Sequence, residues 1–330
     1  MTRTATFEGP LALDLEAYVS LKRALGRKFI TAQRVLRHLD RFLCEAHPAA
    51  EDLSAPIIAA WLAASPGLQP QSAASRLAVV RQFCLYRRRA DPDAFVLDRQ
   101  RDVSFWPARV PRPLPFIYTP EQIRELLHAA LALDATARNP LRPKAMFIFF
   151  LLLYTCGLRF SEASHLTCGD IDLAAGTLRI RDTKFFKTRL VPLAPDVIDE
   201  LRAYLTLRYA ASASPGRERR LFADANDRPY ANSTISETSI RLLRSIGLKP
   251  PQGRRGASVH DVRHTFAVHR ITRWYEQGAD VQNLLPKLAT YMGHKDIRST
   301  QYYLTITNAI LSHANERFEA ACAPPPRATT

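Results

Sequence analysis

The residues best suited to chemistry are five cationic or imidazole side chains followed by one tyrosine. A phosphodiester under nucleophilic attack passes through a crowded state with extra negative charge. A site that works without Mg²⁺ must therefore supply fixed positive charge and a separate proton donor. Arginine, lysine and histidine provide both. The order along the chain predicts a metal-free phosphodiester-cleaving site made of Arg159, Lys184, His260, Arg263, His294 and Tyr303.

The overall charge favours a polyanionic partner. The chain has 330 residues, with 46 Lys and Arg against 31 Asp and Glu and a net charge of +15. This makes nucleic acid the first expectation, with an anionic membrane surface as the alternative. The longest apolar run, 146–153, is too short to span a bilayer, and the first residues do not resemble an export signal. We expect a cytoplasmic, nucleoid-associated bacterial protein with no membrane partner.

The cysteines do not show the spacing of a disulfide framework. All five stand singly, which predicts neither a zinc site nor disulfides and favours a reducing compartment. We therefore expect no metal held by cysteines. The cysteines are Cys44, Cys84, Cys156, Cys168 and Cys322.

A proline-rich stretch divides the chain. Proline removes amide donors and disfavours helix in the residue before it, so we expect an extended linker over 101–118. This gives a helical domain over 1–100, a second domain over 119–318 and a disordered tail over 319–330. The second domain is predicted to be mainly α with a small β-hairpin, an α+β fold.

Two predicted helices of the first domain, 31–46 and 72–89, carry arginines at helical spacing. Such a stripe is often only a solvated helix face. Two stripes in one small basic domain favour contact with DNA phosphates, which positions a protein without reading bases. The candidate residues are Arg34, Arg37, Arg41, Arg76, Arg81, Arg87 and Arg88, together with Lys187 of the second domain.

Periodicity predicts the elements of the second domain. Thr119 caps a helix that starts with Pro120, and alternation over 176–181 and 188–193 around a turn indicates a hairpin. The predicted helices are 121–133, 143–156, 195–210, 234–246, 260–276, 281–292 and 308–322.

Five motifs in order over roughly 119–318 resemble the tyrosine recombinases, the phage-integrase-like family. They are Gly157-Leu158-Arg159 with its flanks, Lys184-x-x-Lys187-x-Arg189-Leu190-Val191-Pro192, His260-x-x-Arg263-His264, Gly293-His294 and Tyr303. The resemblance implies a two-domain C-shaped clamp around DNA, with 1–100 as a SAM-like core-binding domain. The stretch 274–288, an apparent insertion ahead of Gly293, points to a transposon-associated lineage.

The resemblance also implies roles. Tyr303 attacks the scissile phosphate and forms a 3′-phosphotyrosine, so that religation needs no ATP, and we expect no metal and no cofactor. Arg159 and Arg263 clamp the nonbridging oxygens with planar forks that lysine cannot copy. His260 hydrogen-bonds the phosphate or accepts the tyrosine proton, and His294 donates to a nonbridging oxygen.

Several assignments keep an alternative. Lys184 is the expected general acid, with Lys187 as its competitor, because Phe185-Phe186 stands where the family commonly has glycines. His264 is expected to support the fold behind the site, and Tyr302 to be a packing residue. Glu162 and Asp261 are expected to orient the arginines and histidine, or else to cap or pair within their helices.

At the level of function, the resemblance implies site-specific recombination or integration through a Holliday junction. It implies a homo-tetramer on two DNA sites, with or without other subunits, in which helix 308–322 docks on a neighbour or folds back on its own domain. The alternatives are DNA relaxation by a type IB topoisomerase and a noncatalytic DNA-binding accessory protein.

Overall fold

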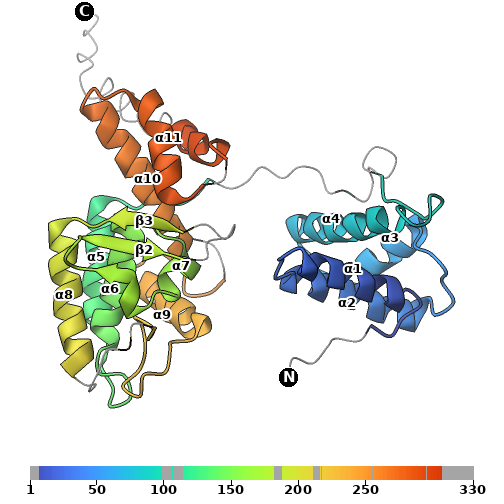
Figure 1. The fold of residues 1–330 in the computed structure, drawn as a ribbon, viewed down its shortest axis with the longest axis horizontal. Helices are drawn as coiled ribbons and strands as arrows, with labels where there is room; N and C mark the ends of the chain where they lie inside the picture. Colours follow the sequence, from blue (N-terminus) through green and yellow to red (C-terminus); the bar gives the residue numbers. More distant parts are fainter. Residues whose placement is uncertain are drawn as a thin grey trace, which may run out of the picture. The chain divides into compact units, whose positions relative to one another are not determined.

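The chain divides into two compact units, residues 1–113 and 114–330. The structure is a computed structural model, and Figure 1 shows its elements. The division falls within the proline-rich stretch expected to link two domains. The residues that the structure describes are 7–98, 106, 114–181, 188–210, 216, 218–253, 256–294 and 296–306.

Unit 1 is built from four helices in the part that the structure describes. Their apolar faces meet in one core that includes the fully buried Leu36, Trp61 and Phe83. Ser54 accepts a hydrogen bond from the backbone N–H of Ile57 and so begins the third helix. The helices are α1 (Ala12–Ala24), α2 (Ile30–Ala46), α3 (Ala55–Ala63) and α4 (Pro70–Arg87).

Unit 2 is arranged around α6 (Arg142–Thr155), whose sequence is apolar on nearly every side. It packs against α5 (Pro120–Leu131), α7 (Phe160–Ser164), α8 (Pro195–Ala210) and α10 (Val259–Glu276). α9 (Asn232–Ser245) packs on α5, α7 and α10. The buried Phe149, Phe150 and Leu152 fill the centre, as expected for a helix that is hydrophobic all round.

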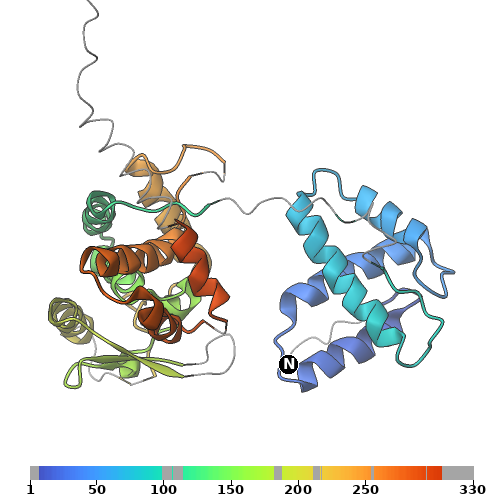
Figure 2. The same ribbon diagram turned by 90° about the horizontal axis from the view of Figure 1, so that it is seen from above.

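A small antiparallel sheet completes this unit. Its strands are β1 (Ile171–Asp172), β2 (Thr177–Ile180) and β3 (Arg189–Pro192), in the order β1-β2-β3, with a 3₁₀ turn η2 (Cys168–Asp170) before them. Leu178 pairs with Val191 across the hairpin. Figure 2 shows the strands together at the edge of unit 2. The predicted hairpin is confirmed, and β1 adds a strand that was not predicted.

A second, smaller core lies between α10, α11 (Val281–Met292) and residues 298–306, which are helical. It includes Phe266, Leu285 and Met292, and it also includes Tyr303. In Figure 1, α10 and α11 lie at one end of unit 2, above the sheet. Residues 274–288, which resembled an insertion, form the end of α10, a turn and the start of α11.

The predicted mainly helical fold with a small sheet is confirmed. Helices begin and end within a few residues of the predicted ranges, and only 308–322 lies outside the described residues. No described helix has both the length and the apolar character needed to cross a bilayer.

Candidate active site

A left-handed turn at the end of α6 delivers Arg159. Gly157 has φ +58°, and a Cβ there would lie 2.4 Å from the ring of Phe266, so both the conformation and the space require glycine. The next residue, Leu158, is fully buried. Arg159 then stands at the N-cap of α7, where its backbone N–H donates to Glu162 at 2.9 Å. The glycine turn and the cap together fix the backbone position of Arg159.

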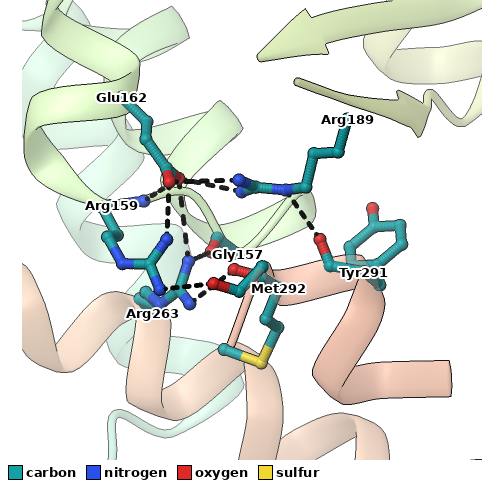
Figure 3. Close-up of polar contacts among 8 residues, drawn as sticks. Gly157, Arg159, Glu162, Arg189, Arg263, Tyr291 and Met292 are labelled. Carbon is teal, nitrogen blue, oxygen red and sulfur yellow. Dashed lines mark hydrogen bonds and ion pairs between the residues drawn. The ribbon is translucent and has the colours of Figure 1, made fainter. Parts of the chain in front are cut away.

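Besides the backbone N–H of Arg159, Glu162 binds the guanidinium groups of Arg159 and Arg189 (Figure 3). Arg159 Nη1 donates to Oε1 at 2.6 Å, while Arg189 forms a fork, with Nη1 to Oε1 at 3.1 Å and Nη2 to Oε2 at 2.8 Å. Arg263 Nη1 lies 3.8 Å from Oε2. Burial opposes ionisation of Glu162, but the bonds and charges of Arg189 and Arg159 outweigh it and lower its pKa to about 2.

Three arginines also hold the end of α11. The carbonyls of three consecutive residues, 291, 292 and 293, each accept one hydrogen bond from a different guanidinium: Arg189 Nε at 2.9 Å, Arg263 Nη2 at 2.8 Å and Arg159 Nη2 at 2.8 Å. The last carbonyls of a helix lack intrahelical donors and carry partial negative charge, so cations stabilise them. His294, the next residue, is positioned by this helix end.

Arg263 is the most deeply placed of the three. It lies on α10, is 2% exposed, and also donates from Nη1 to the Gly157 carbonyl at 2.5 Å. Burial, followed by the charge of Arg159, lowers its pKa to about 10. Three guanidiniums therefore surround one carboxylate among the contacts that the structure describes. Such an excess of positive charge suits an anionic ligand.

Three histidines, His260, His264 and His294, form a second group that contacts Tyr303. His260 and His264 lie one helical turn apart on α10, and their rings meet edge to face with the centroids 4.7 Å apart. His264 Nδ1 lies 2.9 Å from the Tyr303 hydroxyl oxygen. The His294 ring stacks on the Tyr303 ring, with the ring centroids 6.2 Å apart. His294 Nδ1 lies 2.7 Å from Thr300 Oγ1. Burial, aided by neighbouring positive charge, lowers the pKa of all three histidines, to about 4 for His264 and about 3 for His294.

The structure distinguishes the two adjacent tyrosines. Tyr303 is 2% exposed, with burial raising its pKa against the opposing charges of Arg263 and Arg159. Tyr302 is 36% exposed, and its ring contacts the Tyr303 ring with centroids 6.2 Å apart. Adjacent residues of a helix point in directions about 100° apart, and only one of the two faces the histidines.

The expected site residues that the structure describes are therefore brought together. The contacts given above join Arg159, His260, Arg263, His294 and Tyr303 into one group. Lys184 and Lys187 lie outside the described residues. Glu162 does orient Arg159, as expected. Asp261 takes the alternative role of a cap, accepting from the Ser258 backbone N–H at 2.8 Å at the start of α10.

The predicted phosphate-contacting arginines of unit 1 fall into two groups. Arg34, Arg37 and Arg41 are exposed along one side of α2, and Arg88, also exposed, donates to the Pro92 carbonyl. Arg76 donates to Ser65 Oγ, and Arg81 to the Leu97 carbonyl.

Arg87 is a correction to the predicted set. Its side chain is 12% exposed and pairs with Asp14 at 2.6 Å and with Asp52. Both partners are far away in sequence, so the spacing of arginines alone gave no sign of them. Arg87 ties α1 and the segment before α3 to α4, and it is not free to bind phosphate.

Two residues of the site were not predicted to belong to it: Arg189 was given no role, and His264, which contacts the Tyr303 hydroxyl, was expected only to support the fold behind the site. Arg189 shares a strand face with the buried Val191, while Leu190 between them is exposed. An arginine on the inward face of a strand was the available signal. His264 follows His260 by four residues, a spacing that puts both on one helix face.

Comparison with known proteins agrees with this geometry. The model of the Phage integrase family matches residues 117–309. The chain is 35% identical to the putative integrase/recombinase y4rB of Sinorhizobium fredii (strain NBRC 101917 / NGR234), over 92% of this chain and 96% of that protein. It is 32% identical to tyrosine recombinase XerA of Thermococcus kodakarensis (strain ATCC BAA-918 / JCM 12380 / KOD1), over 64% of this chain and 65% of the relative.

Solved structures share the fold. XerH site-specific recombinase bound to palindromic difH substrate aligns with a TM-score of 0.65 at 17% identity, covering 93% of this chain and 85% of that one. The Tn1549 transposon integrase in complex with transposon right end DNA aligns with a TM-score of 0.63 at 17% identity, covering 88% and 94%. Together with the sequence matches, the assembled arginines, histidines and tyrosine show that this chain belongs to the phage integrase family of tyrosine recombinases.

Proposed function

We propose that Tyr303 is the nucleophile with which this chain breaks and rejoins DNA. As a tyrosine recombinase, the chain is an enzyme of site-specific recombination, and topoisomerase activity is not favoured. In cleavage, Tyr303 Oη bonds to phosphorus, the bond to the 5′ oxygen breaks, the phenol loses its proton and the 5′ oxygen gains one. The products are a 3′-phosphotyrosine and a 5′-hydroxyl, and the reverse step joins strands exchanged through a Holliday junction.

The observation that carries this proposal is the surroundings of Tyr303. Its hydroxyl is 2.9 Å from His264 Nδ1, its ring stacks on His294, and both Arg159 and Arg263 are close enough to act on its pKa. A tyrosine that serves packing alone needs no such group of imidazoles and guanidiniums. The arrangement combines a nucleophile with the positive charge that a phosphodiester requires.

Arg159 and Arg263 would bind the nonbridging oxygens of the scissile phosphate. Each guanidinium has five N–H groups. Bonds to Glu162, to the Gly157 carbonyl and to the carbonyls at the end of α11 use part of this set and hold both forks in place before DNA arrives. Preorganised donors of this kind cost little reorganisation when negative charge develops in the transition state.

The remaining roles are assigned as follows. His294, neutral because of its lowered pKa, would donate from Nε2 while Nδ1 accepts from Thr300. His260 would hydrogen-bond the phosphate or accept the tyrosine proton. Lys184 would protonate the leaving 5′ oxygen, with Lys187 as the alternative; the chemistry needs no metal or other cofactor.

The partner would be double-stranded DNA carrying a specific site. This is supported by the charge of the chain and by the DNA complexes of XerH and the Tn1549 integrase. We assign 1–100 to core binding, 101–118 to the linker, 119–318 to catalysis and 319–330 to a tail. A homo-tetramer on two sites, linked by helix 308–322, would perform the exchange at the bacterial nucleoid in the cytoplasm.

The test is covalent capture of DNA. A pool of nicked duplexes with random sequence around the nick is incubated with the protein, and denaturation-resistant complexes are isolated and sequenced. The duplex recovered best is then offered to Tyr303→Phe and to the matched control Tyr302→Phe. We expect an adduct with the wild type and with Tyr302→Phe but none with Tyr303→Phe; an adduct with Tyr303→Phe would refute the assignment.

A further inference from the structure

The histidine that contacts the Tyr303 hydroxyl is His264. His260, which belongs to the motif expected at the site, meets the edge of the His264 ring, and no hydrogen bond between His260 and Tyr303 is seen among the described contacts. His264 Nδ1 and Tyr303 Oη are 2.9 Å apart, a normal hydrogen-bond length. The ring centroids are 5.5 Å apart with the planes inclined at 56°.

The surroundings of His264 keep its imidazole neutral. Burial is the largest cause of its lowered pKa, and the charges of His260 and Arg263 on the same helix lower it further. Together they outweigh Asp261, which raises the pKa, and bring the pKa of His264 to about 4. Tyr303 faces it from residues 298–306. A neutral imidazole has one nitrogen that accepts and one that donates, whereas a protonated one only donates. At neutral pH, His264 Nδ1 is able to accept the tyrosine hydrogen.

This hydrogen bond has a directional consequence. When the O–H bond of Tyr303 points at His264, its oxygen lone pairs must point elsewhere, and the charges of Arg263 and Arg159 act on the same hydroxyl by lowering its pKa. These are the groups assigned to the scissile phosphate. An attacking oxygen whose lone pairs face the bound phosphorus is held near the geometry of reaction, which contributes to rate.

We propose that His264 is a further catalytic residue of this recombinase, which accepts the hydrogen bond of the Tyr303 hydroxyl and so aims the attacking oxygen at the phosphate. The inference rests on the proposed role of Tyr303 as nucleophile. It assigns to His264 orientation of the hydroxyl rather than permanent removal of its proton, because a strongly depressed pKa makes this imidazole a weak base.

The test compares three variants on the duplex recovered by covalent capture. His264→Leu removes the acceptor, and His264→Asn restores an oxygen at the δ position, where Nδ1 stood. His269→Leu is the matched control, because His269 lies on the same helix and its Nδ1 pairs with the Tyr154 hydroxyl at 3.0 Å. The rate of covalent complex formation and the noncovalent dissociation constant are both measured.

We expect His264→Leu to form the adduct about 100-fold more slowly than the wild type, with DNA binding unchanged. His264→Asn should recover to within about tenfold of the wild type, and His269→Leu should react at the wild-type rate. In ¹⁵N spectra of the free protein, Nδ1 of His264 should resonate as an unprotonated nitrogen.

Several results would overturn the inference. They are a wild-type rate for His264→Leu, equal defects for His264→Asn and His264→Leu, loss of DNA binding in step with the rate, or a protonated Nδ1. The proposed function is judged separately by Tyr303→Phe. If Tyr303→Phe forms no adduct while His264→Leu reacts normally, only the role of His264 is refuted.

Discussion

At the scale of single residues, Glu162 links protonation to stability. Its pKa in the folded protein is about 2, below the ordinary 4.5. A depressed carboxyl pKa contributes stability that is complete above the ordinary value and is lost as the pH falls through the folded value. The shift corresponds to about 3 kcal/mol.

We therefore predict that unfolding free energy falls between pH 4.5 and pH 2 more steeply in the wild type than in Glu162→Gln. The amide cannot titrate and should leave a less stable protein at neutral pH, because three guanidiniums then lack their carboxylate. Urea unfolding at a series of pH values measures this. Parallel curves for the two proteins would contradict the prediction.

Comparing alanine substitutions at Gly157 and Gly278 separates the destabilisation caused by steric crowding from that caused by backbone strain. Both have positive φ, but a Cβ at 157 would meet the Phe266 ring at 2.4 Å, whereas nothing lies within 4 Å of a Cβ at 278. We expect Gly278→Ala to cost about 1 kcal/mol and Gly157→Ala about 3 kcal/mol or more, with loss of cleavage because Arg159 moves. Thermal unfolding measures both, and equal shifts would show that the ring yields.

At the scale of elements, Arg189 joins the sheet to a helix. It lies on β3, forks onto Glu162 of α7 and donates to the carbonyl at the end of α11. Its side chain is 11% exposed. Breaking a buried pair by removing one partner costs about 3–5 kcal/mol, and lysine cannot reproduce the fork.

We predict that Arg189→Met and Arg189→Lys both lower stability and slow adduct formation, with lysine recovering only part. Arg179, exposed on the neighbouring strand, gives the matched control Arg179→Met, which should change neither quantity by much. Chemical unfolding and covalent capture provide the two measurements. Wild-type cleavage by Arg189→Met would mean that the link between β3 and α11 is dispensable.

The elements also show what sequence reasoning captures. The helix over 121–133 was predicted from local signals, because Thr119 suits a cap and Pro120 the first turn. The structure has this helix as α5 and adds a capping box, in which Thr119 and Gln122 exchange hydrogen bonds of 3.2 and 2.9 Å. β1 was missed because two residues cannot display alternation. The carboxylates that hold Arg87 lie 73 and 35 residues away, and the grouping of arginines around α11 depends equally on distant partners. Local periodicity carries no record of such contacts.

At the scale of the whole molecule, the exposed arginines of α2 should govern affinity rather than specificity. Replacing Arg34, Arg37 and Arg41 by Gln should weaken DNA binding about equally for all sequences and reduce the salt dependence of log K by up to about 3. Fluorescence anisotropy at several salt concentrations measures this. Arg202→Gln, whose arginine is paired with Asp199 on its own helix, is the control and should leave the slope unchanged.

An unchanged salt slope in the triple variant would remove α2 from the DNA-binding surface. Unequal losses for different sequences would mean instead that α2 reads bases. Either result would leave the active site untouched, since these arginines belong to unit 1 and the catalytic side chains to unit 2.

The contacts at the end of α11 constrain the length of this helix. Three successive carbonyls are matched one to one with arginines from β3, α10 and the start of α7. One added or deleted residue within α11 would rotate its end by about 100° and shift it by about 1.5 Å, mismatching all three partners at once. Changes of length in this lineage should therefore accumulate in the turn before Asp280 and be absent from the helix itself.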